Sequence, residues 1–229
     1  MGSGILVSGQ GVMRTEDLIG SLSSGLAPVR RMRAPGTQAL IWLGGAAGLI
    51  GLAVLLHGLR PDLAAVLMMP QGGWQFLASM ATGITAAFAA AMLARADRPA
   101  RWAWLPVPFL VTWLSLLGLG CIEDLARLGE AAMHPTLSTG CIQFIGMLGV
   151  PLAVGLLLLL RHAGPVRPVP VLLLGALASA ALCSAGLSLF HHLDAALEVL
   201  ISHGLAVLLV MGLARVFGSA ILMRPASAA

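Results

Sequence analysis

The sequence predicts an all-α integral membrane protein with six transmembrane helices, preceded by a short amphipathic helix. The first observation is composition, since 59% of the 229 residues are hydrophobic and only 10% are charged. Soluble domains carry about 25% charged residues. The second is that the apolar residues fall into stretches of about 20, the length that crosses roughly 30 Å of hydrocarbon. The third is a one-sided distribution of arginines between these stretches.

Six stretches are long and apolar enough to be spans: residues 37–59, 72–94, 102–122, 139–160, 169–190 and 199–217. Their connections are short, so consecutive spans should be antiparallel neighbours. Glycine and alanine are frequent within them and would let helices approach closely in lipid. We expect Pro106, Pro108 and Pro151 to start or kink helices. Four tryptophans near span ends fit an interfacial belt: Trp42, Trp74, Trp102 and Trp104.

The arginines orient the spans. With a cytoplasmic N-terminus, only Arg60 and Arg127 of the 13 basic residues fall in outer loops, and the other 11 fall in inner segments. Such a bias is typical of the cytoplasmic side of a membrane. We therefore expect a multi-pass protein of the bacterial inner membrane with both termini in the cytoplasm. The net charge of +4 then reflects topology, and we expect no direct binding of nucleic acid.

This pattern divides the chain into four parts. Residues 1–12 are either a flexible tail or a misassigned start, with Met13 as the alternative first residue. Residues 13–36 form a cytoplasmic segment, residues 37–217 the six-helix domain and residues 218–229 a cytoplasmic tail.

The segment before the first span has the pattern of a short amphipathic helix. Thr15 is a candidate N-cap, Glu16 and Asp17 would lie in the positive first turn, and Pro28 would end the helix. One helical stripe holds the apolar residues at spacings of three and four: Leu18, Ile19, Leu22 and Leu26. Such a helix either lies on a bilayer or docks into a partner. Because its polar face carries acids and serines, we favour a protein partner that contacts the stripe together with Glu16 and Asp17.

The spans hold no charged residue near their middle, which argues against transport and against hydrolysis within the bilayer. The sequence also lacks Walker, HExxH and GxSxG motifs. We therefore expect no enzyme and no resident cofactor.

The cysteines and histidines form the second candidate site. Eight of the nine map to the outer side of the predicted topology, and His162 is the exception. Thiolate and imidazole could hold a metal ion of unknown identity. Cys121 and Cys141 flank one outer loop and could form a disulfide, or each cysteine could simply be a packing residue. The alternative function is therefore a small metal- or redox-handling enzyme or carrier.

Several segments resemble the NrsF-type negative regulators of extracytoplasmic-function sigma factors. They are MRTEDLIGSLSSGLAPVR from Met13, LHGLRPDL at 56–63, RWAWLP at 101–106, Cys141 opening span 4, LRHAGPVRP at 160–168 and HGLAVLLVMGLAR from His203. The resemblance implies an inner-membrane anti-sigma factor whose N-terminal segment sequesters a sigma factor. It also implies release on a periplasmic signal of metal or oxidative stress, sensed through cysteine.

One position departs from this family. Its members carry a cysteine just after span 5, where this sequence reads His191-His192. A switch made of two cysteines therefore does not transfer directly. Cys141 could pair with Cys121, combine with His192 and His191 in a metal site, or have no sensory role.

Overall fold

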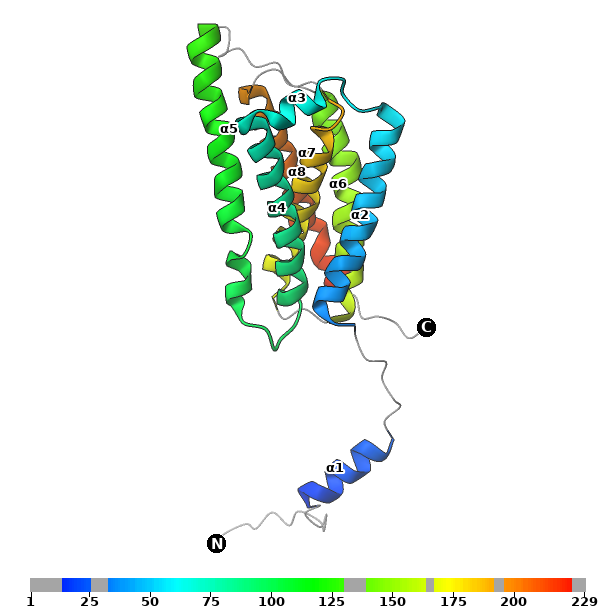
Figure 1. The fold of residues 1–229 in the computed structure, drawn as a ribbon. Helices are drawn as coiled ribbons and strands as arrows, with labels where there is room; N and C mark the ends of the chain where they lie inside the picture. The colour runs from blue at the N-terminus through cyan, green and yellow to red at the C-terminus, as the bar shows by residue number, and fades with distance from the viewer. Residues whose placement is uncertain (1–13, 26–32, 130–138, 164–166, 192–195, 224–229) are drawn as a thin grey trace. The chain divides into compact units, whose positions relative to one another are not determined.

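The computed structural model of the chain describes residues 14–25, 33–129, 139–163, 167–191 and 196–223 (Figure 1). The chain divides into two units, Met1–Met32 and Arg33–Ala229. The described part of the first unit, residues 14–25, holds α1 (Thr15–Ser24). The second is a helical bundle: α2 (Pro35–His57), α3 (Leu63–Met68), α4 (Pro70–Leu93), η1 (Ala100–Trp104), α5 (Val107–Leu128), α6 (Thr139–Leu160), η3 (Arg161–Ala163), α7 (Pro168–Leu187) and α8 (Ala196–Met223).

The predicted all-α fold is confirmed, and five helical segments are long and apolar enough to cross a membrane. Segments of sufficient length and apolar character to cross a bilayer are Pro35–His57, Pro70–Leu93, Ala100–Arg127, Gln143–Ala163 and Pro168–Leu187. The sixth predicted span coincides with α8, in which the apolar run found among the described residues is shorter, Val207–Phe217. A sixth crossing therefore stays a prediction.

Helix α7 lies at the centre of the bundle. It packs against α2, α4, α6 and α8, whereas α5 packs on the outside against α4 and α8. Nearly every residue from Val171 to Leu187 is buried. The α7 sequence is apolar on all sides, as a fully surrounded helix requires, and its many alanines, serines and glycines let neighbouring backbones approach closely.

Two glycines mark close contacts between α7 and its neighbours α4 and α2. A Cβ added at Gly83 of α4 would lie 2.6 Å from Cγ of Leu182 and 3.1 Å from the carbonyl oxygen of Ala178, both on α7. A Cβ added at Gly186 of α7 would lie 2.5 Å from a methyl carbon of Ile50 on α2. Both contacts need a residue without a side chain, so α4 and α2 are each fitted to the same central helix.

Trp42 does not belong to an interfacial belt as predicted. It is buried, and its indole Nε1 donates a hydrogen bond to the carbonyl oxygen of Leu152 on α6 at 2.9 Å. A buried indole N–H needs such an acceptor. Trp74 and Trp104, in contrast, are exposed at 62% and 71%, which fits the belt position.

Helix α1 begins one residue earlier than predicted. Its N-cap is Arg14, whose carbonyl oxygen accepts the Leu18 amide at 3.0 Å, so Thr15 is the first helical residue and not the cap. The helix ends at Ser24 with Gly25 as C-cap. The hydroxyls of Ser21, Ser23 and Ser24 bond to carbonyls three residues back, a local alternative to helix continuation. Leu26 and Pro28 therefore follow the helix and lie outside the described residues.

Prolines begin several helices. Pro35, Pro70 and Pro168 are the first residues of α2, α4 and α7, where the missing N–H costs nothing. Pro106 is the N-cap of α5, Pro108 lies in its first turn, and Pro151 lies inside α6, as predicted. The short helix α3 was not predicted, and it crosses between the ends of α2 and α4 (Figure 1).

The Gly83 contact gives a stability prediction. Gly83→Ala should lower the free energy of unfolding by about 1–3 kcal/mol, because the added methyl overpacks a contact between two helices. Gly155→Ala is the matched control, since a Cβ there meets nothing within 4 Å. Thermal unfolding of the detergent-solubilised proteins checks both. Equal midpoints for Gly83→Ala and Gly155→Ala would contradict the close packing.

Candidate functional site

The first candidate site is the apolar face of α1. The side chains of Leu18, Ile19 and Leu22 are exposed at 45%, 60% and 64%, and no residue of α1 is buried. Glu16 and Asp17 lie in its first turn, where carboxylates are stabilised by the helix dipole. A ten-residue helix is marginal in isolation, so a surface that covers these three side chains would stabilise it. The predicted partner-binding role of this face stays a prediction.

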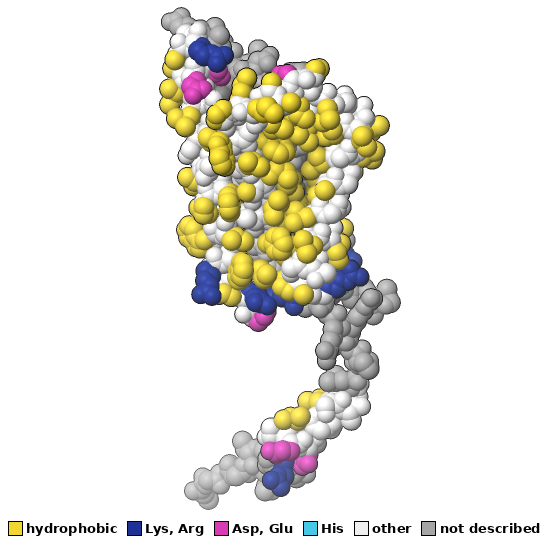
Figure 2. All heavy atoms as spheres, in the orientation of Figure 1, with side chains coloured by type: hydrophobic (Ala, Val, Ile, Leu, Met, Phe, Trp, Pro, Cys, Tyr) yellow, Lys and Arg dark blue, Asp and Glu magenta, His cyan; other side chains and the backbone are white. Residues whose placement is uncertain are grey.

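The second candidate region is one end of the bundle, which we call the arginine end. Figure 2 shows Arg side chains gathered there, below a wall of hydrophobic side chains. The Arg95 guanidinium donates to the carbonyl oxygen of Arg33, and Arg167 Nη1 donates to that of Arg98 at 2.9 Å. These bonds join the start of α2, the segment after α4 and the start of α7. Arginines from distant parts of the sequence therefore share one end of the bundle.

The arginine end also has unused hydrogen-bonding capacity. Among the described residues, Nε of Arg95, Nε of Arg161 and Oε1 of Gln38 are buried without a hydrogen-bond partner. Buried polar atoms without a partner are rare in folded proteins. Water or a bound group at this end would satisfy them.

The opposite end, which we call the histidine end, is held together by aromatic rings. The His57 ring at the end of α2 stacks on Phe190 with centroids 4.9 Å apart, and Phe144 of α6 meets Phe190 edge-on at 5.0 Å. His57 Nδ1 lies 2.8 Å from the carbonyl oxygen of Ala53. Such ring pairs stabilise a structure beyond the effect of burying the rings. They therefore hold α2, α6 and the segment after α7 together at this end.

An arginine fixes the same segment. Arg60 forms a two-point ion pair with Asp62, with both N–O distances at 2.7 Å. Its Nη1 donates to the carbonyl oxygen of His191 at 3.3 Å, and its amide donates to that of Leu189 at 3.0 Å. A guanidinium and a carboxylate joined by two hydrogen bonds hold each other in a defined orientation. The loop between α2 and α3 is thereby joined to the end of α7.

The predicted sensor residues are placed only in part. Cys121 is a half-buried free thiol in α5. His191 is the residue after Phe190 in the sequence. Cys141 lies in the first turn of α6, but its side chain is outside the described residues, as is His192. In the described part of the chain no three Cys, His, Asp or Glu side chains come together as metal ligands would. The disulfide and the metal site therefore stay predictions.

Cys183, in contrast, is fully buried in the core. A Cβ added at Gly149 of α6 would lie 3.9 Å from its sulfur. It behaves as a small packing residue, which was one of the two expectations for a cysteine within a span.

Sequence reasoning missed the rings of His57, Phe144 and Phe190, and the contacts of Arg60. These residues belong to segments up to 131 positions apart, and nothing in the spacing of apolar residues relates one segment to another. The one signal available was the shared outer location of His57 and His191 in the predicted topology.

The fold and the two ends define the class: a multi-pass helical membrane protein with a separate short helix that carries an exposed apolar face. The comparisons with known proteins add the family. The family model described as "Negative regulator of sigma F" (NrsF) matches residues 22–223. The chain therefore belongs to the NrsF family, and the resemblance noted in the sequence is confirmed. Membership in a family of regulators implies a regulatory protein and not an enzyme.

A curated relative agrees with this assignment. The "Probable anti-sigma-F factor NrsF" of Azospira oryzae is 30% identical over 180 residues, which cover 75% of this chain and 83% of that protein. No solved structure shows a significant match. The family match begins at Leu22, inside α1, so Glu16, Asp17, Leu18 and Ile19 precede it.

Proposed function

We propose that this protein is an anti-sigma factor of the inner membrane, which holds an extracytoplasmic-function sigma factor at the cytoplasmic face through α1. Family membership is the observation that carries the proposal, because the family consists of negative regulators of sigma F. The relative from Azospira oryzae bears the name of an anti-sigma factor. The exposed stripe of Leu18, Ile19 and Leu22 supports α1 as the contact, since an amphipathic helix can dock such a face into a groove.

The orientation follows from charge. The arginine end faces the cytoplasm and the histidine end faces the periplasm, because cytoplasmic loops carry the excess of arginine. Residues 13–36 then lie on the cytoplasmic side, where a sigma factor is found.

The proposed signal acts at the histidine end and is a metal ion or an oxidant. The candidate sensor residues are Cys141, Cys121, His191 and His192. Cys141 opens α6, the helix whose Phe144 contacts Phe190, and Phe190 in turn stacks on His57 of α2. A change of packing there reaches α2 directly.

Helix α2 connects this end to the N-terminal segment. It is continuous from His57 to Pro35, a length of about 35 Å at 1.5 Å per residue. A signal releases the sigma factor only if it binds one packing arrangement more tightly than the other. Changing the bound population from 99% to 1% requires about 5.5 kcal/mol of differential affinity.

The contact surface is tested by charge substitution on α1. Leu18→Asp with Leu22→Asp should abolish co-purification of the sigma factor from solubilised membranes, because carboxylates cannot enter an apolar groove without a large desolvation penalty. Gly20→Asp with Ser24→Asp is the matched control, with the same charges at the same spacing on the opposite face of the helix. We expect the control to retain the sigma factor, which proteomics identifies. Unchanged binding by the leucine variant would contradict the proposed contact.

The orientation is tested by labelling single cysteines in a background without native cysteines. Leu59→Cys at the histidine end should react with a membrane-impermeant maleimide added to intact spheroplasts. Asp97→Cys at the arginine end should react only after lysis. Both side chains are well exposed, so accessibility differs only by the side of the membrane. The reverse pattern would overturn the topology.

The sensor is tested with cysteine variants and a promoter that depends on the sigma factor. Cys141→Ala should retain repression but lose induction by oxidant or metal, because the reactive group is removed. Cys183→Ala is the control, since that thiol is buried in the core and should leave induction intact. Normal induction of the Cys141→Ala strain would show that Cys141 is not the sensor.

A further inference from the structure

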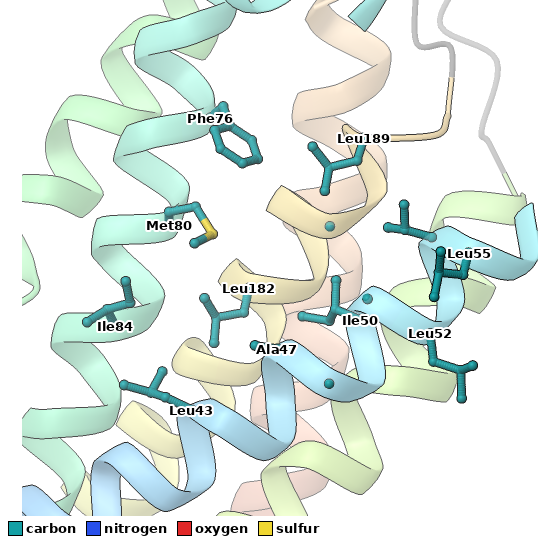
Figure 3. Close-up of a pocket in the computed structure, with 14 residues that line it drawn as sticks. Leu43, Ala47, Ile50, Leu52, Leu55, Phe76, Met80, Ile84, Leu182 and Leu189 are labelled. Atoms are coloured by element: carbon teal, nitrogen blue, oxygen red, sulfur yellow. The ribbon is translucent and has the colours of Figure 1, made fainter. Parts of the chain in front are cut away.

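An apolar pocket of about 880 Å³ lies between α2 and α4, with α7 as its floor (Figure 3). Its fourteen lining residues are apolar or glycine, among them Ile50 of α2 and Met80 of α4. Such a lining selects for no particular ligand, and nothing in the structure shows what covers it. The arginine end of the bundle is different, because there the described residues leave charged groups without a counter-charge.

The arginine end carries an excess of positive charge. The described segments there hold these arginines: Arg33, Arg95, Arg98, Arg101, Arg161 and Arg167. Asp97 is the one acid in the same described segments, and its carboxylate lies 3.4 Å from Nε of Arg98. The described residues therefore leave most of this charge unbalanced.

Two of these arginines have buried hydrogen-bond donors that are not used. Arg95 and Arg161 are half-buried, and in each the Nε atom is buried without a hydrogen-bond partner among the described residues. Arg33, Arg98 and Arg101, in contrast, are exposed. A guanidinium that is partly withdrawn from water without a counter-charge is costly. An anion at this position would remove that cost and accept both N–H groups.

Helix register places these two groups at one level. The hydrogen bond from Trp42 to Leu152 fixes α2 against α6, and the two helices run in opposite directions (Figure 1). Arg33 and Arg161 each lie nine residues from that bond in sequence, about 14 Å toward the arginine end at 1.5 Å per residue. Arg95 is at the same level, because its guanidinium bonds to the carbonyl oxygen of Arg33. Arg95 and Arg161 therefore flank the start of α2.

The start of α2 adds two features that suit an anion. The amides of its first turn point toward the arginine end, and the helix dipole favours negative charge there. Gln38 lies one turn inside the helix, and its side chain leans back toward the helix start. Its Oε1 is likewise buried without a partner among the described residues, and a water molecule bound to the anion can donate to it.

The level of the two arginines identifies the class of anion. Figure 2 shows the arginine side chains at the border of the hydrophobic wall of the bundle, which is where phospholipid headgroups meet a membrane protein. The planar guanidinium matches phosphate oxygens in two-point hydrogen bonds. The bilayer itself holds phosphate groups at this level, whereas a free phosphate would have to leave bulk water.

We propose that Arg95 and Arg161 bind the phosphate of an anionic phospholipid beside the start of α2. The lipid comes from the leaflet at the arginine end and supplies the counter-charge that the described residues lack. Because Arg95 also holds the carbonyl oxygen of Arg33, the bound headgroup anchors the segment where the chain enters α2. This inference rests on membrane insertion and not on the sigma factor, so it can fail independently of the function proposed above.

The test is native mass spectrometry of the full-length protein in detergent, titrated with phosphatidylglycerol and, separately, with phosphatidylcholine. Both lipids carry a phosphate, but only phosphatidylglycerol has a net negative charge. We expect the first phosphatidylglycerol to bind several-fold more tightly than the first phosphatidylcholine. This comparison needs no variant to fold.

Paired substitutions locate the site. Arg95→Gln with Arg161→Gln should weaken the binding of phosphatidylglycerol several-fold, because both unused donors and their charges are removed. Arg101→Gln with Arg215→Gln is the matched control, since it removes the same charge from exposed side chains and should bind the lipid as the wild type does. Thermal melting followed by circular dichroism shows that each variant is folded.

A lysine pair separates the donors from the charge. Arg95→Lys with Arg161→Lys keeps both positive charges but removes the Nε groups and the planar fork. We expect it to bind phosphatidylglycerol more weakly than the wild type and more tightly than the glutamine pair.

Four outcomes would overturn the proposal. Equal affinity for the two lipids would leave an acidic protein segment as the counter-charge. Wild-type binding by the glutamine pair would place the lipid elsewhere, and wild-type binding by the lysine pair would reduce the effect to diffuse charge. Displacement of the lipid by millimolar inorganic phosphate would make free phosphate the ligand.

Discussion

Close contact between α7 and its neighbours is the constraint on which the bundle depends. In lipid, apolar side chains gain nothing by leaving their solvent, so helices associate through packing and a few hydrogen bonds. Gly83 and Gly186 allow close approaches, to Leu182 and Ile50. The alanines of α4 and α7 continue the same surface. The other helices are positioned by how they meet this central element.

Helix α2 is held in a different way. Its first half packs into the bundle through Ala39, Trp42 and Ala46, whereas its second half is attached mainly through Ile50, which meets Gly186, and His57, which stacks on Phe190. Between these points it borders the apolar pocket. A helix held at few points can change its packing at lower cost than one surrounded on all sides, as α7 is. The helix that leads from the N-terminal segment is therefore also well suited to move.

The proposed functions belong to different parts of the chain. These parts are α1, for which we propose partner binding, the arginine end and the histidine end, and α2 connects the last two. The rings and the Arg60 contacts at the histidine end join three segments, so a local chemical change there alters more than one helix. Coupling between two sites requires a structural element that can adopt two packing arrangements and that both sites influence.

The sequence alone determined the fold class, five spans, the proline starts and the family. These depend on local properties, namely the length of apolar stretches, the fixed φ of proline and the order of short motifs. The same reasoning placed the apolar stripe on α1. It misjudged where that helix begins and ends, because backbone hydrogen bonds decide these boundaries and make Arg14 and not Thr15 the N-cap.

Only the tertiary structure decided which helix is central, which tryptophan is buried and which residues meet at the histidine end. Trp42 and Trp74 both lie near predicted span ends, yet only Trp42 faces a carbonyl oxygen on another helix. The sequences of α2 and α7 are apolar on every side, so they do not show which face meets protein and which meets lipid. The pocket between α2 and α4 has the same origin: it results from the angle between helices, which the spacing of apolar residues along one chain does not specify.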